Sequence, residues 1–187
     1  MQLFVCGFCF DAEHERVVLI EKERPAWQSG RLNGVGGKVE PGESVADAMT
    51  REFEEEAGVR LPAHAVGDGA QPVPGIWTPF CVLTLNGDAE SEPLTGASST
   101  AEVVAEKVRT DGSAGSDGRV IFFRAVSSDA VRRVRTVETE PIRRITVEDV
   151  SRPGPIREQC LPNLRWLIPL ALDPEQTIAH AQIGGRL

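Results

Sequence analysis

The run from Gly37 to Val59, GKVEPGESVADAMTREFEEEAGV, places charged side chains at spacings that could do chemistry. Glu52, Glu55 and Glu56 lie three and four residues apart, so on a helix their side chains share one face. Like charges at that spacing destabilise a bare helix, and we therefore expect a cation among them. Mg2+ takes oxygen ligands and commonly joins carboxylates to substrate phosphates. The run thus predicts a metal site for phosphate chemistry.

The neighbouring residues predict the elements that position this cluster. A helix over about residues 44–57 should begin with the capping-box pattern of Ser44 and Asp47, and Gly58 suits a left-handed cap at its end. Its apolar stripe at helical spacing consists of Val45, Ala48, Met49 and Phe53. The loop before it is rich in glycine and proline, and glycine lets the backbone approach a ligand or metal closely. The alternative, a solvated acidic helix face, would not require this loop.

The same run matches every position of the Nudix box, Gly-x5-Glu-x7-Arg-Glu-U-x-Glu-Glu-x-Gly-U, with Phe53 and Val59 at the two apolar U positions. The chain therefore resembles the MutT/Nudix family. The likeness is strongest over the 23 residues of the box, and flanking features extend it over most of the chain. The resemblance implies an α/β fold, the Nudix α/β/α sandwich with a mixed central sheet. It also implies hydrolysis of a nucleoside diphosphate linked to a further group.

The resemblance assigns roles to the box residues. It implies that Mg2+ or Mn2+ is held chiefly by Glu52, Glu55 and Glu56, and that a backbone carbonyl at Gly36 or Gly37 completes the metal shell. Arg51 would orient a box carboxylate, and Glu43 would support the geometry of loop and helix. The candidate catalytic residues are Glu43, Arg51, Glu52, Glu55 and Glu56. Glu52 is the first candidate for the general base, although sequence alone does not separate ligand from base.

Hydrolysis of a pyrophosphate link requires a site that holds a cation and a base. The oxygens of a pyrophosphate link are negative and repel a nucleophile, whereas Mg2+ neutralises that charge and lowers the pKa of a bound water. A general base must lie within hydrogen-bond reach of this water. Relatives often add a carboxylate from a loop outside the box. In VETEPIRRITVEDV that position falls at Glu138 or Glu140, and the alternative for each is an exposed loop acid.

The substrate is predicted from residues outside the box. LIEKERPAWQSGRLNGVGG resembles, without a gap, a stretch of the purine nucleoside triphosphatases that sanitise oxidised nucleotides, in which the residue at Asn33 contacts the base. Asn33 could instead stabilise a turn. LPNLRWLIPLAL resembles a later segment of that group, but Asn163 replaces the first base-recognising acid, and the second is absent. The departure weakens the case for oxidised guanine. The candidate substrate-binding residues are Arg24, Arg31, Asn33, Lys38 and Asn163.

Three functions remain open at this stage. The first is a Mg2+-dependent nucleoside triphosphate pyrophosphohydrolase, which releases a monophosphate and pyrophosphate. The second is a pyrophosphatase for ADP-ribose or a nucleotide sugar. The third, of another class, is a Nudix-fold nucleotide sensor without turnover, and the intact acidic cluster argues against it.

Composition agrees with one domain that binds a small molecule. A Nudix domain is expected over residues 1–172, with an inserted flexible loop or hairpin extension at 86–118 and a tail at 173–187. The net charge of −8 argues against a nucleic-acid polymer as partner, and no apolar run is long enough for a membrane span. We expect a cytoplasmic monomer or homodimer with a nucleotide substrate.

Several smaller expectations concern local structure. Apolar runs predict strands at residues 2–10, 16–22, 76–85, 119–126 and 142–147. A short helix is possible at 101–109, and Asn163 should cap a helix over 164–172. The four cysteines are expected to be buried free thiols. Cys6 and Cys9 have CxxC spacing, but on a strand they would face opposite sides.

Overall fold

The computed structural model describes residues 2–64, 73–86, 118–173, 175 and 178–184, and its centre is one mixed β-sheet. The strands are β1 (Gln2–Phe10), β2 (Arg16–Glu21), β3 (Leu32–Asn33), β4 (Thr78–Asn86), β5 (Gly118–Val126), β6 (Ile142–Thr146) and β7 (Ala179–Gly184). Their order is β3-β2-β1-β5-β4-β7, and β6 pairs with β2. β1 and β5 run parallel, as do β4 and β7, whereas the other pairs are antiparallel.

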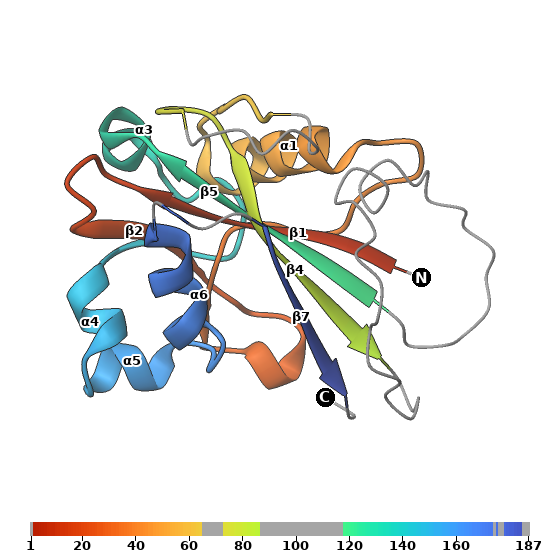
Figure 1. Cartoon of the computed structure of the whole chain (residues 1–187). Helices are drawn as coiled ribbons and strands as arrows, with labels where there is room; N and C mark the ends of the chain where they lie inside the picture. Colours follow the sequence, from red (N-terminus) through yellow and green to blue (C-terminus); the bar gives the residue numbers. More distant parts are fainter. Residues whose placement is uncertain (1, 65–72, 87–117, 174, 176–177, 185–187) are drawn as a thin grey trace.

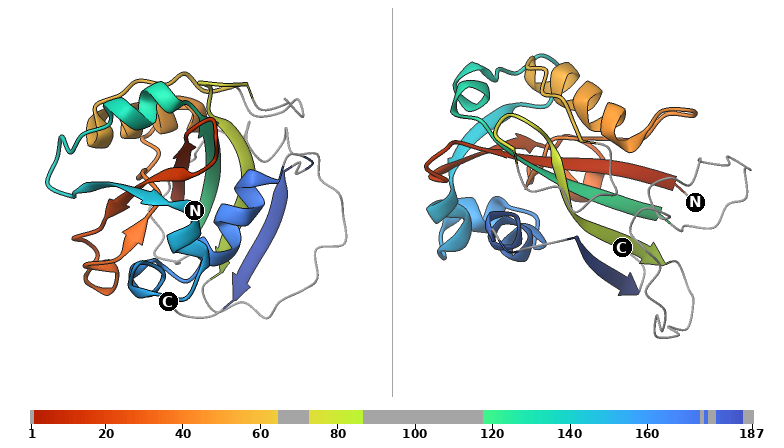
Figure 2. Two further views of the ribbon diagram at one scale, coloured as in Figure 1. Left: turned by 90° about the vertical axis from the view of Figure 1, so that its left-hand side faces the viewer. Right: turned by 45° about the horizontal axis from the view of Figure 1, so that its top comes forward.

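Helices cover both faces of this sheet. On one face lie α1 (Val45–Ala57) and α3 (Ser128–Arg133), and on the other lie α4 (Val147–Ser151), α5 (Pro155–Gln159) and α6 (Leu164–Leu172) (Figure 1). The two further views in Figure 2 show the same three layers, with the sheet between the helices. The predicted α/β/α sandwich with a mixed central sheet is confirmed.

Two apolar cores lie on the two faces of the sheet, because side chains alternate along a strand. In β1, Val5 and Cys9 belong to the core beneath α1 and α3. Cys6, Phe8 and Phe10 belong to the core beneath α4 and α6. All four cysteines are buried and free, as expected, and the CxxC pair does diverge. This spacing therefore reflects strand periodicity and not a zinc or redox site.

The helix that carries the acidic cluster forms as its sequence predicts. The hydroxyl of Ser44 accepts a hydrogen bond from the amide of Asp47 at 3.1 Å, which caps the start of α1. Gly58 ends the helix in the left-handed region at φ 70°. The whole predicted apolar stripe is buried. Phe53 packs edge-on against Trp77 with ring centroids 5.0 Å apart, so this stripe fixes which face of α1 is left for the charged residues.

The glycine loop is built into the sheet where β1 and β2 separate. β1 pairs directly with β2 only near its end, at Cys9 and Phe10. After β2, the segment β3 pairs with β2. The glycine loop that follows β3 then crosses to the first half of β1. There the amide of Val5 donates to the carbonyl of Gly37 at 2.9 Å, and the amide of Gly7 donates to the carbonyl of Val35 at 2.7 Å. The loop that precedes α1 is therefore held by backbone hydrogen bonds.

Some expectations for local structure were incomplete or wrong. Residues 179–184, which we expected in a tail, form strand β7 beside β4. Asn163 precedes α6, but its side chain makes no capping hydrogen bond. The reason is that Asn163 already has helical dihedral angles, and the carbonyls of Leu161 and Pro162 accept from the first amides of α6. Most of the expected insertion at 86–118, with its possible helix at 101–109, lies outside the described residues.

No helix among the described segments has the length and apolar character needed to cross a lipid bilayer.

Candidate active site

Arg51 is the centre of the charged network on α1. Its guanidinium donates to both carboxylate oxygens of Glu43, at 2.8 and 3.0 Å, which makes a bidentate pair. It also donates to Glu52 at 2.9 Å and to Glu55 at 2.8 Å. A further hydrogen bond of 3.1 Å reaches the carbonyl of Lys38. One side chain thus ties the loop before the helix to two carboxylates on the helix.

Lys22 forms a second cationic centre that joins three separate parts of the chain. It follows β2, and its ammonium group lies 4.0 Å from Glu56 on α1. The same group donates a hydrogen bond to Glu140, which lies just before β6. The other oxygen of Glu140 accepts from the amides of Glu23 and Arg24 at 2.7 and 3.1 Å. The side chains of Lys22, Glu56 and Glu140 are only 16%, 10% and 14% exposed.

Two glycines allow the loop to approach these carboxylates. Gly36 lies at φ 150°, and its amide donates to Glu56 at 3.0 Å. A β-carbon at Gly36 would lie 2.3 Å from the carbonyl oxygen of Val5. A β-carbon at Gly37 would lie 2.7 Å from both carboxylate oxygens of Glu52. The predicted close backbone approach is therefore present at both positions, and only glycine fits without displacement.

Burial and neighbouring cations move the pKa values of these acids in opposite directions. Burial raises the pKa of Glu56 to about 7, although Lys22 and the Gly36 amide oppose the rise. Burial likewise raises the pKa of Glu52. The hydrogen bonds from Arg51 lower the pKa of Glu43. For Glu140, burial acts to raise the pKa, but the hydrogen bonds from Lys22 and two amides lower it overall. The charged forms of Glu52 and Glu56 therefore need a nearby cation.

The repulsion argument from the sequence needs a correction. Among the residues described, no group of three or more His, Cys, Asp or Glu side chains lies close enough to hold a metal ion. Glu52 is 13% exposed, but Glu55 is 48% exposed and turns toward solvent. Arg51 and Lys22 already supply positive charge to the carboxylates. The like charges on α1 are therefore balanced without a metal, and their spacing alone does not require one.

The donor set nevertheless fits a hard divalent cation. Every candidate ligand is an oxygen: the carboxylates of Glu52, Glu55, Glu56 and Glu140, and the carbonyl of Gly37. The carbonyl of Gly37 accepts one hydrogen bond from Val5 and so retains a second lone pair. The ammonium group of Lys22 already occupies a position between two of these carboxylates. A cation is thus accommodated at this point in the fold.

Glu140, and not Glu138, comes near the box carboxylates. Glu138 is exposed and makes no hydrogen bond or ion pair with any other described residue. Backbone hydrogen bonds dock the loop that carries Glu140 on the last turn of α1, from Arg135 to Ala57 and from Val137 to Glu56. The sequence left these two acids as alternatives, and tertiary contacts separate them.

The predicted substrate-binding residues divide into two groups. Asn33 lies on β3, and its side-chain oxygen accepts the amide of Gly34 at 2.8 Å. The segment that leads to Asn163 lies beside β3, because the amide of Leu161 donates to the carbonyl of Leu32 at 3.0 Å. These two asparagines thus come from neighbouring segments.

The three basic candidates lie less closely together. Arg24 is exposed, and its backbone amide, not its side chain, contacts Glu140; Lys38 is exposed at the glycine loop. The guanidinium of Arg31 instead donates to the carbonyl of Glu158 at 2.6 Å, at the end of α5. Arg31 is therefore engaged away from the box carboxylates.

Lys22 is the residue that sequence reasoning undervalued. It is not among the catalytic, metal-binding or substrate-binding residues that we predicted from the sequence. A lysine directly after an apolar strand is a weak signal, because most such lysines face solvent. Its partners, Glu56 and Glu140, are separated from it by long stretches of chain, so no local pattern could identify the contact.

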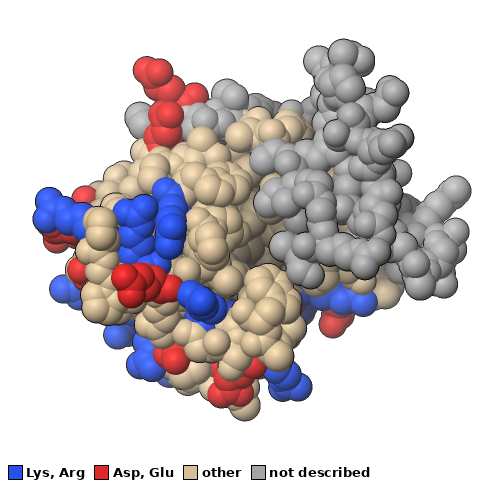
Figure 3. Space-filling model, turned by 90° about the horizontal axis from the view of Figure 1, so that it is seen from below, with Lys and Arg blue, Asp and Glu red and all other residues tan. Residues whose placement is uncertain are grey.

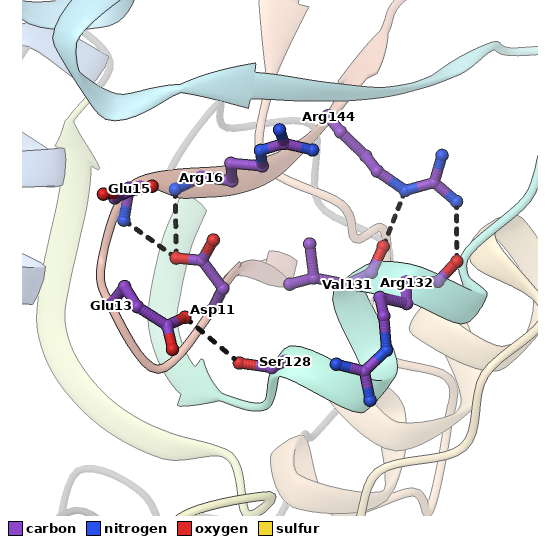
Figure 4. A pocket seen from close by; sticks show the side chains of 8 residues that line it. All are labelled: Asp11, Glu13, Glu15, Arg16, Ser128, Val131, Arg132 and Arg144. Carbon is purple, nitrogen blue, oxygen red and sulfur yellow. Dashed lines mark hydrogen bonds between the residues drawn. The ribbon is translucent and has the colours of Figure 1, made fainter.

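A separate cavity of about 620 Å3 lies between the β1–β2 turn and α3 (Figure 4). Its lining residues are Asp11, Glu13, Glu15, Arg16, Ser128, Val131, Arg132 and Arg144, none of which belongs to the box. Asp11 accepts the amides of Glu15 and Arg16, and Arg144 donates to backbone carbonyls at the end of α3. These hydrogen bonds hold the turn and the end of α3 in place.

Charged side chains elsewhere lie mostly in local, exposed ion pairs. Examples are Arg60 with Glu54 at 2.6 Å and Arg133 with Asp129 at 3.0 Å. Figure 3 shows the face on the side of α4, α5 and α6, where basic and acidic side chains lie next to one another. Exposed pairs of this kind contribute little to stability. The pairs around Lys22 and Arg51 are less exposed, so we expect them to contribute more to stability.

Comparison with known proteins agrees with this geometry. A sequence profile described as the NUDIX domain matches residues 2–167. The chain belongs to the Nudix family. The family resemblance inferred from the box is thereby confirmed. A curated relative, the oxidized purine nucleoside triphosphate hydrolase of Mus musculus, is 44% identical over 54 residues. That match covers 28% of this chain and about a third (34%) of the length of the relative.

Solved structures show the same Nudix fold at low sequence identity. A MutT protein from Bacillus halodurans has a TM-score of 0.57 and 16% identity, and the match covers 96% of this chain and 90% of that one. The MutT protein of Methanosarcina mazei Go1 has a TM-score of 0.52 and 15% identity, with 91% of each chain covered. The NUDIX domain of Shewanella oneidensis NrtR, solved with ADP ribose, has a TM-score of 0.53 and 15% identity, with 90% and 84% covered. These likenesses concern the fold alone.

The two loop glycines allow a prediction that separates fold from site. Gly37→Ala should lower kcat about 100-fold, because the new β-carbon displaces the Glu52 carboxylate, and misplacement by about 1 Å has that effect. Its free energy of unfolding should fall by less than about 1 kcal/mol, because the flexible end of a side chain can move aside. Urea unfolding and steady-state kinetics measure the two quantities.

Gly36→Ala should behave differently. Its β-carbon would meet backbone at a φ that disfavours alanine, so we expect a loss of about 2–4 kcal/mol in unfolding free energy. Equal losses of unfolding free energy in the two variants would contradict the expectation that Gly37 serves the active site and Gly36 the fold.

Proposed function

We propose that this Nudix protein hydrolyses a nucleoside triphosphate to a nucleoside monophosphate and pyrophosphate, with Mg2+ or Mn2+ as cofactor. The observation that carries the proposal is a pair of cation-centred contacts beside a glycine loop: Lys22 lies between Glu56 and Glu140, and Arg51 binds Glu52. At this place, ligand atoms that are all oxygens lie beside a backbone that a bound ligand can approach closely.

In this proposal the metal would be held by Glu55, Glu56 and Glu140, with the carbonyl of Gly37, while Glu52 is left free to act as a base. When bound, the divalent cation neutralises phosphate charge and lowers the pKa of a bound water. Water adds to one phosphorus of the anhydride, and the bridging oxygen leaves with pyrophosphate. A proton must be removed from that water, and this requires a base within hydrogen-bond reach.

Glu52 is the residue that we propose as this base. Arg51 donates to one of its oxygens at 2.9 Å, and the second oxygen accepts no hydrogen bond from any other described group. The bidentate pair between Arg51 and Glu43 holds the guanidinium in position, so the orientation of Glu52 is set by the loop as well as by the helix. Arg51 and Glu43 are thus positioning residues in this proposal.

Base recognition is proposed for Asn33 and Asn163. The side-chain oxygen of Asn33 is already used by the amide of Gly34, so its amino group is the part that can donate to an acceptor on a base edge. The side chain of Asn163 makes no capping bond and can donate or accept. The partial match to an oxidized purine nucleoside triphosphate hydrolase supports a purine substrate. Arg24 and Lys38 are proposed to contact the phosphates.

One observation favours a second candidate. The structurally similar NUDIX domain of NrtR was solved with ADP ribose, which also contains a diphosphate link. Hydrolysis of ADP-ribose or a nucleotide sugar at the same carboxylates is therefore the alternative proposal.

A panel assay distinguishes these proposals. The protein is incubated with Mg2+ and each of the common and oxidised nucleoside triphosphates, ADP-ribose and nucleotide sugars. Phosphate release is measured with and without added inorganic pyrophosphatase, and nucleoside monophosphate is measured by chromatography. We expect phosphate only when pyrophosphatase is present, together with one monophosphate per triphosphate, and no turnover in EDTA.

Other outcomes have equally clear meanings. AMP formed from ADP-ribose without pyrophosphate would establish the alternative. Tight nucleotide binding without any product, in the presence of Mg2+ or Mn2+, would contradict both enzymatic proposals and identify a sensor.

A further inference from the structure

Lys22 occupies an unusual position for a lysine side chain. Its ammonium lies between Glu56 and Glu140, and all three side chains are largely shielded from water. The two acids come from α1 and from the loop before β6, whereas Lys22 follows β2. No ion pair on an exposed surface requires such an arrangement, and the desolvation of three charged groups opposes it. The arrangement therefore calls for a reason beyond stability.

Glu56 and Glu140 would repel each other if no cation lay between them. At close range in a poorly solvated site this repulsion is much larger than in water. The ammonium of Lys22 relieves this repulsion as a metal ion would, because it donates a hydrogen bond to Glu140 and lies 4.0 Å from an oxygen of Glu56. Lysine is suited to this role because it carries a compact point charge on a flexible stem that can move away.

We infer that Lys22 is a built-in counter-cation, which holds Glu56 and Glu140 together in the metal-free protein and is displaced when a divalent cation binds. This inference rests on the proposed metal-dependent function. It goes beyond that function because it assigns to Lys22 a role in setting metal affinity. The ammonium and the metal compete for the same carboxylate oxygens, so removal of one must strengthen binding of the other.

The first test measures the affinity for Mn2+ in a titration that is monitored by electron paramagnetic resonance or by calorimetry. For Lys22→Met we expect the dissociation constant of Mn2+ to fall about tenfold, which corresponds to about 1.4 kcal/mol. Lys22→Arg keeps the positive charge and should stay within about threefold of the wild type, because electrostatic competition persists. Arg60→Met removes one charge from an exposed pair at the end of α1 and should change the constant by less than about twofold.

The second test measures stability without metal. Lys22→Met should unfold at lower temperature than the wild type in EDTA, because the two carboxylates then face each other without a cation. Saturating Mg2+ should remove most of this difference. The stabilisation by Mg2+ should therefore be larger in the variant than in the wild type, a result that a merely structural lysine would not produce.

A measurement on the wild type keeps the inference testable even if Lys22→Met fails to fold. The sequence contains only three lysines, Lys22, Lys38 and Lys107, so selective 13C labelling at lysine Cε gives three signals. The Lys22 signal is identified by its loss in Lys22→Arg. It should move on addition of Mg2+ and reach a limit at the same concentration that saturates metal binding.

The outcomes separate this inference from the proposed function. If the wild type binds neither Mg2+ nor Mn2+, with or without nucleotide, both proposals are wrong. If the wild type binds metal but Lys22→Met has unchanged or weaker affinity, or if Lys22→Arg gains as much affinity as Lys22→Met, only the inference about Lys22 is overturned. A Lys22 signal that does not move at saturating Mg2+ would overturn it as well.

Discussion

Glu56→Gln should lower turnover of the nucleotide substrate at least about 100-fold, since even outer partners of metal ligands are worth 10–100-fold. Glutamine keeps the shape of the side chain, and its carbonyl oxygen can still accept the amide of Gly36. The charge is lost, and with it the strongest interaction between this residue and a divalent cation. The affinity for Mn2+ should fall in parallel with kcat.

The fold should tolerate this change. Burial already raises the pKa of Glu56 to about 7, so an uncharged group is compatible with the site. We expect the free energy of unfolding in EDTA to change by less than about 1 kcal/mol. Steady-state kinetics, Mn2+ titration and urea unfolding give the three quantities on one preparation.

Glu54→Gln is the matched control for Glu56→Gln. Glu54 lies on the same helix, but it is exposed and pairs with Arg60 at 2.6 Å, away from the candidate ligands. Its substitution should leave kcat and Mn2+ affinity within about twofold of the wild type. Wild-type turnover in Glu56→Gln, with Mg2+ present and the fold intact, would show that the assignment of the metal site is wrong.

Arg51→Met should produce the largest loss of stability among the charged residues of the box. The guanidinium is the shared partner of Glu43, Glu52 and Glu55, and it also binds the carbonyl of Lys38. Its removal leaves the poorly exposed carboxylates of Glu43 and Glu52 without this cation. Breaking a buried pair in this way costs about 3–5 kcal/mol, and partial exposure reduces the expected loss here to about 2–3 kcal/mol.

The loss should depend on metal and on pH. Mg2+ supplies positive charge to the same carboxylates, so saturating Mg2+ should recover part of the stability. The pKa of Glu43 is lowered by Arg51, so this pair stabilises the fold above the unfolded pKa of glutamate and loses that effect as pH falls through the lower folded value. The difference between Arg51→Met and the wild type should therefore shrink in acid.

Arg60→Met serves as the control for Arg51→Met. It also removes an arginine that pairs with a glutamate of α1, but both partners are exposed at 69% and 46%. Urea unfolding in EDTA should show a change of less than about 0.5 kcal/mol. Equal losses in the two variants would mean that Arg51 is an ordinary surface cation and not the organiser of the site.

Much of the local structure of the site followed from the sequence. The spacing of the apolar stripe gave the buried face of α1, and Ser44 and Gly58 marked its ends. The alternation of β1 predicted that Cys6 and Cys9 would face different cores. These features depend on neighbours within one turn of helix or a few residues of strand. Such contacts repeat wherever the same local pattern occurs, so they can be read without the rest of the chain.

Other features were not accessible in this way. The strand β7 pairs with β4 across more than 90 residues of sequence, and its own composition resembles a polar tail. The glycine loop lies between β1 and β2 because its backbone completes hydrogen bonds that the separated strands leave open. Neither result follows from local preference, because sheet pairing is decided by which distant backbone groups remain to be satisfied.

The sequence by itself determined the chemistry available to this protein: a helix that presents clustered carboxylates, an arginine among them and a glycine loop before them. Only the tertiary structure decided how these charges are balanced. It brought Glu140 to Lys22 and left Glu138 exposed, left Glu55 half exposed, and placed Lys22 between Glu56 and Glu140. The physical reason is that the interaction between poorly solvated charges depends on their distance in space. A sequence gives only their separation along the chain.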